Sequence, residues 1–369
     1  MIKYIDEFRD GEIAKRLAGR IANAVESSRQ YRFMEFCGGH THAIFRYGIA
    51  DLLPENVKLI HGPGCPVCVL PVGRIDNAIE LAKRPDVILA SYADMLRVPG
   101  SGSTSLIRSK ADGADVRMVY SATDALNIAR ENPNREVVFF AIGFETTTPP
   151  TALVVKQAKA LGIGNFSVFC NHVLTPPALC GILGIPGTRL DGAIGPSHVS
   201  AVIGTAPYEF VAKDYKIPMA VAGFEPLDVM QAVLMLVRQA NSGEAAIENE
   251  YTRAVGKEGN IKAQKLMDET FELRESFEWR GLGWMPLSAR KLKDEFSGFD
   301  AEKRFGMLTR SMPDHKACEC GDILRGLKSP HECRVFGTAC TPDNPIGSCM
   351  VSSEGACAAY YSFGRYRAA

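Results

Sequence analysis

The fold of this chain is decided by the segment Tyr31-Arg32-Phe33-Met34-Glu35-Phe36-Cys37-Gly38-Gly39-His40-Thr41-His42. Its first six residues are mostly apolar and predict a short buried strand. A cysteine, two glycines and two histidines follow at once, and the glycines let the backbone approach a bound group closely because they lack a Cβ. The segment therefore predicts a strand that carries reactive side chains into a loop at its carboxyl end.

The same succession of strand, loop and helix recurs up to about residue 240. Besides Tyr31–Phe36, strands are expected at Val57–His61, Val87–Ala90, Val116–Tyr120, Val137–Ile142, Phe166–Phe169, Gly192–Gly195 and Met219–Ala222. Helices are expected at residues 7–27 and at Gly73–Lys83, Ala122–Arg130, Ala152–Leu161 and Leu227–Gln239. This alternation favours βαβ units and therefore an α/β fold with two mainly parallel sheets.

Three domains are expected from these patterns and from the change of composition after Gly243. The first two are α/β domains around a cleft, at residues 1–120 and 121–240. The third, residues 241–369, combines a charged helical stretch over residues 244–280 with a cysteine-rich tail.

Chemically unusual loops follow most of the expected strands. The carboxyl ends of parallel strands meet at one edge of a sheet, where ligands usually bind. We therefore expect a site in the cleft, to which these loops contribute: residues 37–42, 62–68, 91–94, 143–147, 170–172, 195–198 and 223–226. Glu145, Glu225, Cys170, His172 and His198 are weaker candidates, because each suits an ordinary role as a helix cap or as a partner of buried backbone groups.

Three cysteines and one histidine are the best candidates for chemistry in these loops. Cys65-Pro66-Val67-Cys68 is a CxxC motif before a predicted helix, whose first backbone amides favour a thiolate that can act as nucleophile or metal ligand. The same motif also suits half of a zinc site or two inert thiols. Cys37 occupies an equivalent place after its own strand, and His40 offers a ligand, a base or a hydrogen-bond donor.

A second group of cysteines lies in the tail, with the spacing Cys320-x12-Cys333-x6-Cys340-x8-Cys349-x7-Cys357. Thiolates on such irregular backbone suit zinc or an iron–sulfur cluster, and the intervals lack the short paired CxxC knuckles of structural zinc. Cys340 and Cys357 are expected as ligands, while Cys320, Cys333 and Cys349 compete for the two remaining places. Cys318, the first member of a Cys-x-Cys pair, is expected to point away.

Composition narrows the remaining classes of function. Lys and Arg together number 42, as do Asp and Glu, so the chain has no basic footprint for nucleic acid. No apolar run approaches the length of a membrane helix, and the N-terminus lacks an apolar signal core. We therefore expect a cytoplasmic protein that binds neither nucleic acid nor membrane. Since disulfides need an oxidising compartment, the thiols are expected to be free.

Taken together, the motifs resemble those of the HypD family, which matures [NiFe]-hydrogenases. The similarity spans nearly the whole chain, in the loops 37–42, 62–68, 143–147 and 195–200 and in the tail segments 340–342, 345–352 and 354–357. The resemblance implies two α/β domains and a third domain with a [4Fe–4S] cluster. It also implies a scaffold on which iron receives two cyanides and one carbon monoxide, giving an Fe(CN)₂CO unit that is passed on.

The resemblance also implies two partners, a HypC-type small chaperone that shares the iron and a HypE-type protein that donates cyanide. Cys37, Cys65 and Cys68 would hold the iron, with His40 in support. Such a protein is an assembly factor with redox activity rather than an enzyme of small-molecule metabolism. The alternatives are an iron–sulfur-dependent thiol–disulfide reductase that acts through Cys65 and Cys68, and a zinc-bearing interaction scaffold.

Overall fold

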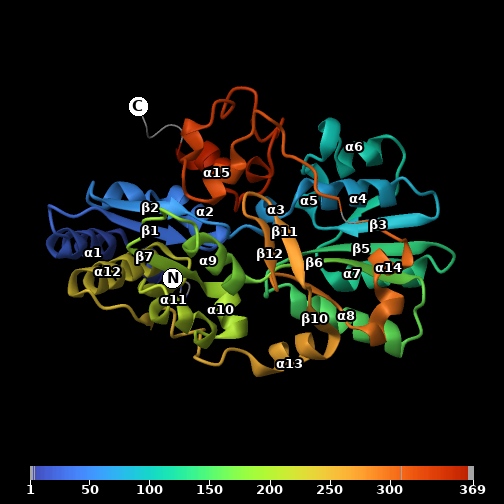
Figure 1. The fold of residues 1–369 in the computed structure, drawn as a ribbon, viewed down its shortest axis with the longest axis horizontal. Helices are drawn as coiled ribbons and strands as arrows, with labels where there is room; N and C mark the ends of the chain where they lie inside the picture. Colours follow the sequence, from blue (N-terminus) through green and yellow to red (C-terminus); the bar gives the residue numbers. More distant parts are fainter. Residues whose placement is uncertain (1–2, 4, 309, 365–369) are drawn as a thin grey trace.

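The computed structural model describes residues 3, 5–308 and 310–364 (Figure 1). Its strands are β1 (Tyr31–Glu35), β2 (Val57–His61), β3 (Val87–Ser91), β4 (Val116–Met118), β5 (Glu136–Gly143), β6 (Phe166–His172), β7 (Gly192–Pro196), β8 (Met219–Ala222), β9 (Ile247–Asn249), β10 (Phe271–Leu273), β11 (Ser276–Trp279), β12 (Gly283–Pro286) and β13 (Arg290–Leu292). Its α-helices are α1 (Gly11–Ala24), α2 (Gly38–Tyr47), α3 (Pro66–Val69), α4 (Val72–Ala82), α5 (Ala93–Arg97), α6 (Leu106–Ala111), α7 (Ala122–Glu131), α8 (Thr148–Ala160), α9 (Thr175–Leu183), α10 (Ser197–Ile203), α11 (Glu209–Lys213), α12 (Pro226–Ser242), α13 (Ile261–Thr270), α14 (Ala301–Arg304), α15 (Cys320–Leu324) and α16 (Ala356–Ala359). All eight predicted strands and all five predicted helices are present, most with ends shifted by a few residues.

Two parallel sheets organise the fold, as the alternation of elements predicted. Sheet A has the strand order β2-β1-β7-β8-β9 and sheet B the order β4-β3-β5-β6, and every strand pair in both sheets is parallel. The central strands are buried on both faces, as strands covered by helices on two sides must be.

The sheets do not divide the chain at residue 120, as the expected domain limits would require. β3 and β4 precede that residue, yet they share sheet B with β5 and β6, and β3 pairs with β5. β7 returns to pair with β1, and β8 pairs with β7. Strand order depends on contacts between distant segments, which the periodicity of single strands does not encode. Sheet A is therefore formed by β1, β2, β7, β8 and β9, and sheet B by the intervening strands β3 to β6.

Helices cover both faces of each sheet. One face of sheet A packs against α12, with α1 outside it, and the other face packs against α9 and α11. Sheet B lies between α7 and α8 on one side and α4 with α6 on the other. The start of α1 is fixed by Asp10, whose carboxylate accepts the backbone N–H groups of Glu12 and Ile13, and α12 ends at Gly243 in the left-handed conformation.

The C-terminal part is less helical than expected. Residues 244–280 contain one α-helix, α13, and the short strands β9, β10 and β11. Phe277 and Trp279 are buried at alternate positions of β11, as in a strand with one buried face, and Phe271 is buried in β10. The cysteine-rich tail follows and packs on α2 and α3 near the junction of the two sheets (Figure 1). Among the described residues, none of the helices is both long and apolar enough to span a lipid bilayer.

Candidate thiol and metal site

Cys37 lies where the strand order of sheet A reverses. The chain runs from β1 to β2 on one side of the sheet, and β7 later adds on the other side of β1. In open parallel sheets the crevice beyond the carboxyl ends of two such strands is the usual binding position. Cys37 follows β1 as the N-cap residue of α2, and α10 begins beside it after β7. The predicted placement of Cys37 at a strand end is confirmed.

The loops that carry Cys37 and the CxxC motif touch through their backbones. The N–H of Gly38 donates to the carbonyl of Gly64 at 3.2 Å. A Cβ on Gly64 would lie 2.3 Å from the backbone nitrogen of Cys37, so only glycine fits there. The CxxC motif begins at the next residue, and its two cysteines, Cys65 and Cys68, are buried and joined by a disulfide. The fold thus places the three predicted thiol residues on two adjoining loops.

Burial and acidic neighbours keep the Cys37 thiol protonated. Its pKa is raised mainly by burial and next by the charge of Glu354, with a smaller contribution from Glu35. The N–H groups of Gly39 and His40 at the start of α2 act in the opposite direction without prevailing. A thiolate at this position therefore needs a compensating cation, which a bound metal would supply.

His40 is buried beside this loop and is neutral. Burial lowers its pKa to about 4. Its Nε2 lies 3.0 Å from the carbonyl oxygens of both Ala222 and Gly223, so Nε2 carries the proton. Nδ1 is left as an acceptor without a hydrogen-bond partner among the described residues. His40 therefore ties α2 to the end of β8 and keeps one free lone pair.

Most of the weaker candidates have structural roles rather than a place at the site. Glu145 accepts the N–H and hydroxyl of Thr175 at the start of α9 at 2.9 and 3.0 Å, which is a capping role. Glu225 caps α12 and pairs with Arg9. His172 is held by Thr151, and the Cys170 thiol donates to the Arg290 carbonyl at 3.3 Å.

Of these candidates only His198 stays near the Cys37 loop, since its ring packs on Phe224, which also contacts the ring of His40. Cys180, on α9, is exposed.

Two residues of the site were not predicted. Glu35, at the end of β1, is fully buried, and its carboxylate accepts the Cys37 N–H at 2.9 Å and the Thr41 hydroxyl. His61, at the end of β2, donates from Nδ1 to the same carboxylate at 2.8 Å. A polar residue within an apolar strand was the available signal.

The tail cysteines separate into a bonded pair and four free thiols. Cys320 and Cys349 form a disulfide, contrary to the expectation that the thiols are free. Cys318, Cys333, Cys340 and Cys357 are unbonded. The fold brings the paired sulfurs together where Gly347 and Ser348 lead into a 3₁₀ turn, η7 (Ser348–Met350), beside α15. Cys320 and Cys349 are therefore not supported as ligands in this state.

The four free thiols influence one another electrostatically. Burial raises the pKa of Cys357 well above its usual range, and the charges of Cys318, Cys340 and Cys333 raise it further. Burial likewise raises the pKa of Cys318 to about 11, with Cys340 contributing. The Ile346 N–H donates to the Cys340 sulfur at 3.4 Å. Four neighbouring thiols, three of them buried and Cys318 half-buried, fit the donor set of an iron–sulfur cluster.

The types of residue fit a cluster, but the side chains are not arranged as ligands of a single metal ion. Among residues 3, 5–308 and 310–364, no group of three or more His, Cys, Asp or Glu side chains is arranged around a common point suited to one metal ion.

The tail contacts the CxxC loop directly. The Ser348 hydroxyl, next to the disulfide-bonded Cys349, donates to the carbonyl of Cys68 at 3.0 Å. A Cβ on Gly38 would lie 2.4 Å from that of Glu354, so the tail also presses on the start of α2. The two groups of cysteines predicted from sequence are thus parts of one continuous region.

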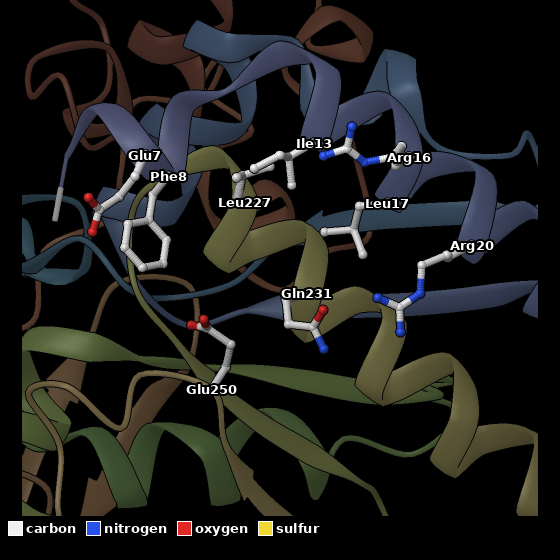
Figure 2. A pocket seen from close by; sticks show the side chains of 9 residues that line it. All are labelled: Glu7, Phe8, Ile13, Arg16, Leu17, Arg20, Leu227, Gln231 and Glu250. Carbon is white, nitrogen blue, oxygen red and sulfur yellow. The ribbon is translucent and has the colours of Figure 1, made fainter. Parts of the chain in front are cut away.

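A separate pocket of about 520 Å³ lies between α1 and α12 (Figure 2). Its lining side chains are Glu7, Phe8, Ile13, Arg16, Leu17, Arg20, Leu227, Gln231 and Glu250, and none of them is a candidate thiol (Figure 2). The link between this pocket and the Cys37 loop is indirect. The Glu250 carboxylate accepts the Gly223 N–H at 3.2 Å, and the Gly223 carbonyl accepts the Nε2–H of His40.

Comparison with known proteins identifies the family of this chain. Residues 12–364 match the family model described as "HypD: Hydrogenase formation hypA family". The chain is 63% identical to the hydrogenase maturation factor HypD of Azotobacter vinelandii, over 100% of this chain and 98% of that protein. It is 62% identical to HypD of Cupriavidus necator, over 99% of this chain and 98% of that protein, and 47% identical to HypD of Escherichia coli, over 98% of each. The chain therefore belongs to the HypD family of hydrogenase maturation factors.

Proposed function

We propose that this protein is the scaffold on which the Fe(CN)₂CO unit of a [NiFe]-hydrogenase is assembled. The observation that carries the proposal is the contact between the Cys37 loop and the loop of Cys65 and Cys68, at the reversal point of sheet A. Three thiols on two touching loops offer soft donors to one iron, which is the cargo of the reaction. Hydrogenase maturation by the family is consistent with such cargo.

The protein's own residues prepare this site. Cys65 and Cys68 bind iron only as thiolates, so their disulfide must first be reduced. A dithiol reductant, itself oxidised to a disulfide, would supply the two electrons and two protons that convert the S–S bond into two S–H groups, which lose their protons when they bind iron. The neutral His40 offers Nδ1 as a hydrogen-bond acceptor, and its Nε2 anchors the end of β8. Cys65 and Cys68 are buried and Cys37 is half-buried, which limits the access of water and oxygen to a centre that they would attack.

A [4Fe–4S] cluster is proposed in the tail, with Cys318, Cys333, Cys340 and Cys357 as the residues that would hold it. When bound, such a cluster supplies electrons one at a time. This choice retains Cys340 and Cys357 from the sequence analysis and gives one of the two open places to Cys333. Cys318 takes the other place, for which Cys320 and Cys349 were the remaining candidates. Anaerobic protein should be brown with about four irons.

The cluster assignment is tested with two matched substitutions in one Cys-x-Cys pair. Cys318→Ala should lose iron, sulfide and colour, whereas Cys320→Ala should keep them. The opposite result restores Cys320 as a ligand, and stoichiometric zinc without sulfide removes the cluster altogether.

The scaffold role is tested by infrared spectroscopy of anaerobic protein purified with its HypC-type partner. Cyanide and carbonyl stretching bands are expected. Cys37→Ala should abolish them while the brown cluster remains, and Cys180→Ala, which removes an exposed thiol that is not part of the candidate site, is the control. Bands that persist in Cys37→Ala would contradict the role of this residue.

Partners are proposed on the same basis: a HypC-type chaperone that covers the Cys37 loop and a HypE-type cyanide donor. A transient interface of about 1,200–2,000 Å² in total is expected, because the iron must be passed on. Hydrogen exchange with and without the chaperone should show protection at residues 37–48 and 62–72. Protection confined to residues 318–357 would contradict this arrangement.

One observation favours the second candidate, a thiol–disulfide reductase. Two disulfides, Cys65–Cys68 and Cys320–Cys349, lie on segments that are linked by the Ser348 hydroxyl and the Cys68 carbonyl. A reductase would turn over a disulfide substrate without partners and show no cyanide or carbonyl bands, and the infrared experiment therefore separates the two functions.

A further inference from the structure

Glu35 collects hydrogen bonds from both thiol-bearing loops. Its side chain has no exposed surface, and one carboxylate oxygen accepts the Cys37 N–H at 2.9 Å. The other accepts the Thr41 hydroxyl from the first turn of α2 and the Nδ1–H of His61 at 2.8 Å. A buried carboxylate is stable only when it is well paired, so these donors are held tightly.

His61 connects this carboxylate to the second loop. It ends β2, and the next residue, Gly62, donates its N–H to the Glu35 carbonyl at 2.9 Å. Its ring packs on Phe45 with centroids 4.9 Å apart, and its side chain is 12% exposed to a surface pocket of about 390 Å³. His61 is thus fixed at the start of the segment that leads to Cys65.

We propose that Glu35 and His61 form a clamp that positions Cys37 against the Cys65–Cys68 loop. The purpose of the clamp rests on the proposed function. The clamp itself is inferred from the contacts alone. Glu35 is a positioning residue, because it touches the Cys37 backbone and not the sulfur. Without the clamp, the two loops retain the contacts of Gly38 with Gly64 and of Gly62 with Glu35, and Cys37 opens more often.

Three substitutions separate the clamp from the general stability of the protein. His61→Phe keeps a ring against Phe45 and removes the Nδ1–H. His61→Asn keeps a donor near the position of Nδ1. Thr41→Val removes the hydroxyl and preserves the shape of the side chain.

The measurement is the rate at which iodoacetamide alkylates Cys37, with exposed Cys180 in the same molecule as reference. The Cys37/Cys180 ratio should rise on the order of tenfold in His61→Phe, because a hydrogen bond to a charged group is lost. It should rise in Thr41→Val as well and return toward the wild-type ratio in His61→Asn.

Each outcome decides the matter. An unchanged ratio in both His61→Phe and Thr41→Val overturns the clamp, and so does a rise that His61→Asn fails to reverse. Equal acceleration of Cys37 and Cys180 alkylation indicates general loosening of the protein and also overturns the clamp.

Maturation assays separate the clamp from the proposed function. If His61→Phe alters the alkylation ratio while Cys37→Ala still matures hydrogenase, the clamp stands and the proposed function falls. If Cys37→Ala loses maturation while both clamp variants mature normally, the function stands and the clamp falls.

Discussion

Replacing Gly64 by alanine tests whether the contact between the two thiol loops matters. The added Cβ would lie 2.3 Å from the Cys37 nitrogen and 2.4 Å from its Cα, whereas ordinary contacts begin at 3.4 Å. Both neighbours are backbone atoms next to a helix start, so no flexible side chain can turn aside. The loops must separate by roughly 1 Å to accommodate the methyl group.

Two effects of different size follow from this displacement. Overpacking of this kind lowers the free energy of unfolding by about 1–3 kcal/mol. Misplacement of reacting groups by about 1 Å costs on the order of a hundredfold in rate. Gly64→Ala should therefore remain folded, with a melting temperature a few degrees lower, and lose most of its maturation activity.

The assay is hydrogenase activity after maturation in a strain that lacks the native factor, together with thermal unfolding of the purified variant. Gly164→Ala is the matched control, because a Cβ there meets nothing within 4 Å and the backbone is not left-handed. Wild-type maturation by Gly64→Ala would refute the reasoning, since the loops would then tolerate separation. Equal loss in Gly164→Ala would show that the assay responds to glycine replacement in general.

Two further predictions concern buried carboxylates. The pKa of Glu250 is raised from 4.5 to about 7 by burial and by the charge of Asp228, so ionising it destabilises the fold by up to about 3 kcal/mol as pH rises from 4.5 through 7. Glu250→Gln should therefore raise the melting temperature relative to wild type at pH 8.5 but not at pH 4.5, and an equal effect at both pH values would contradict this. Despite burial, Arg74 and Arg274 lower the pKa of Glu302 to about 2, so Glu302→Gln should destabilise the protein by about 3 kcal/mol at pH 7, and the difference should shrink as pH falls from 4.5 toward 2. Denaturant unfolding at pH 7 and pH 3 measures it, and a pH-independent difference would show that the ion pairs contribute little.

The elements of the fold were predictable because their signals are local. β5 and β8 are short apolar runs that end in glycine or alanine, and α12 follows a proline and a capping carboxylate. Their partners were not predictable, since β3 and β7 carry similar apolar patterns yet belong to different sheets. Register and strand order depend on contacts across the chain, and for that reason the expected boundary at residue 120 does not coincide with the division between the two sheets.

The location of Cys37, Cys65 and Cys68 at strand ends was also local information. Glu35 was missed because a charged residue in a short strand normally alternates outward, whereas here it is buried and satisfied by donors from distant segments. Only the fold supplies those donors. A buried acid in a strand before a cysteine loop is nevertheless a signal that sequence analysis can use.

Spacing alone does not show which tail cysteines are bonded to each other. The Cys-x-Cys pair contains one free thiol, Cys318, and one disulfide-bonded cysteine, Cys320. Gly347 lets the free thiol approach the backbone closely, because a Cβ there would lie 2.3 Å from the Cys318 sulfur but 3.7 Å from the Cys320 sulfur. Gly347→Ala should therefore displace the Cys318 sulfur more than that of Cys320.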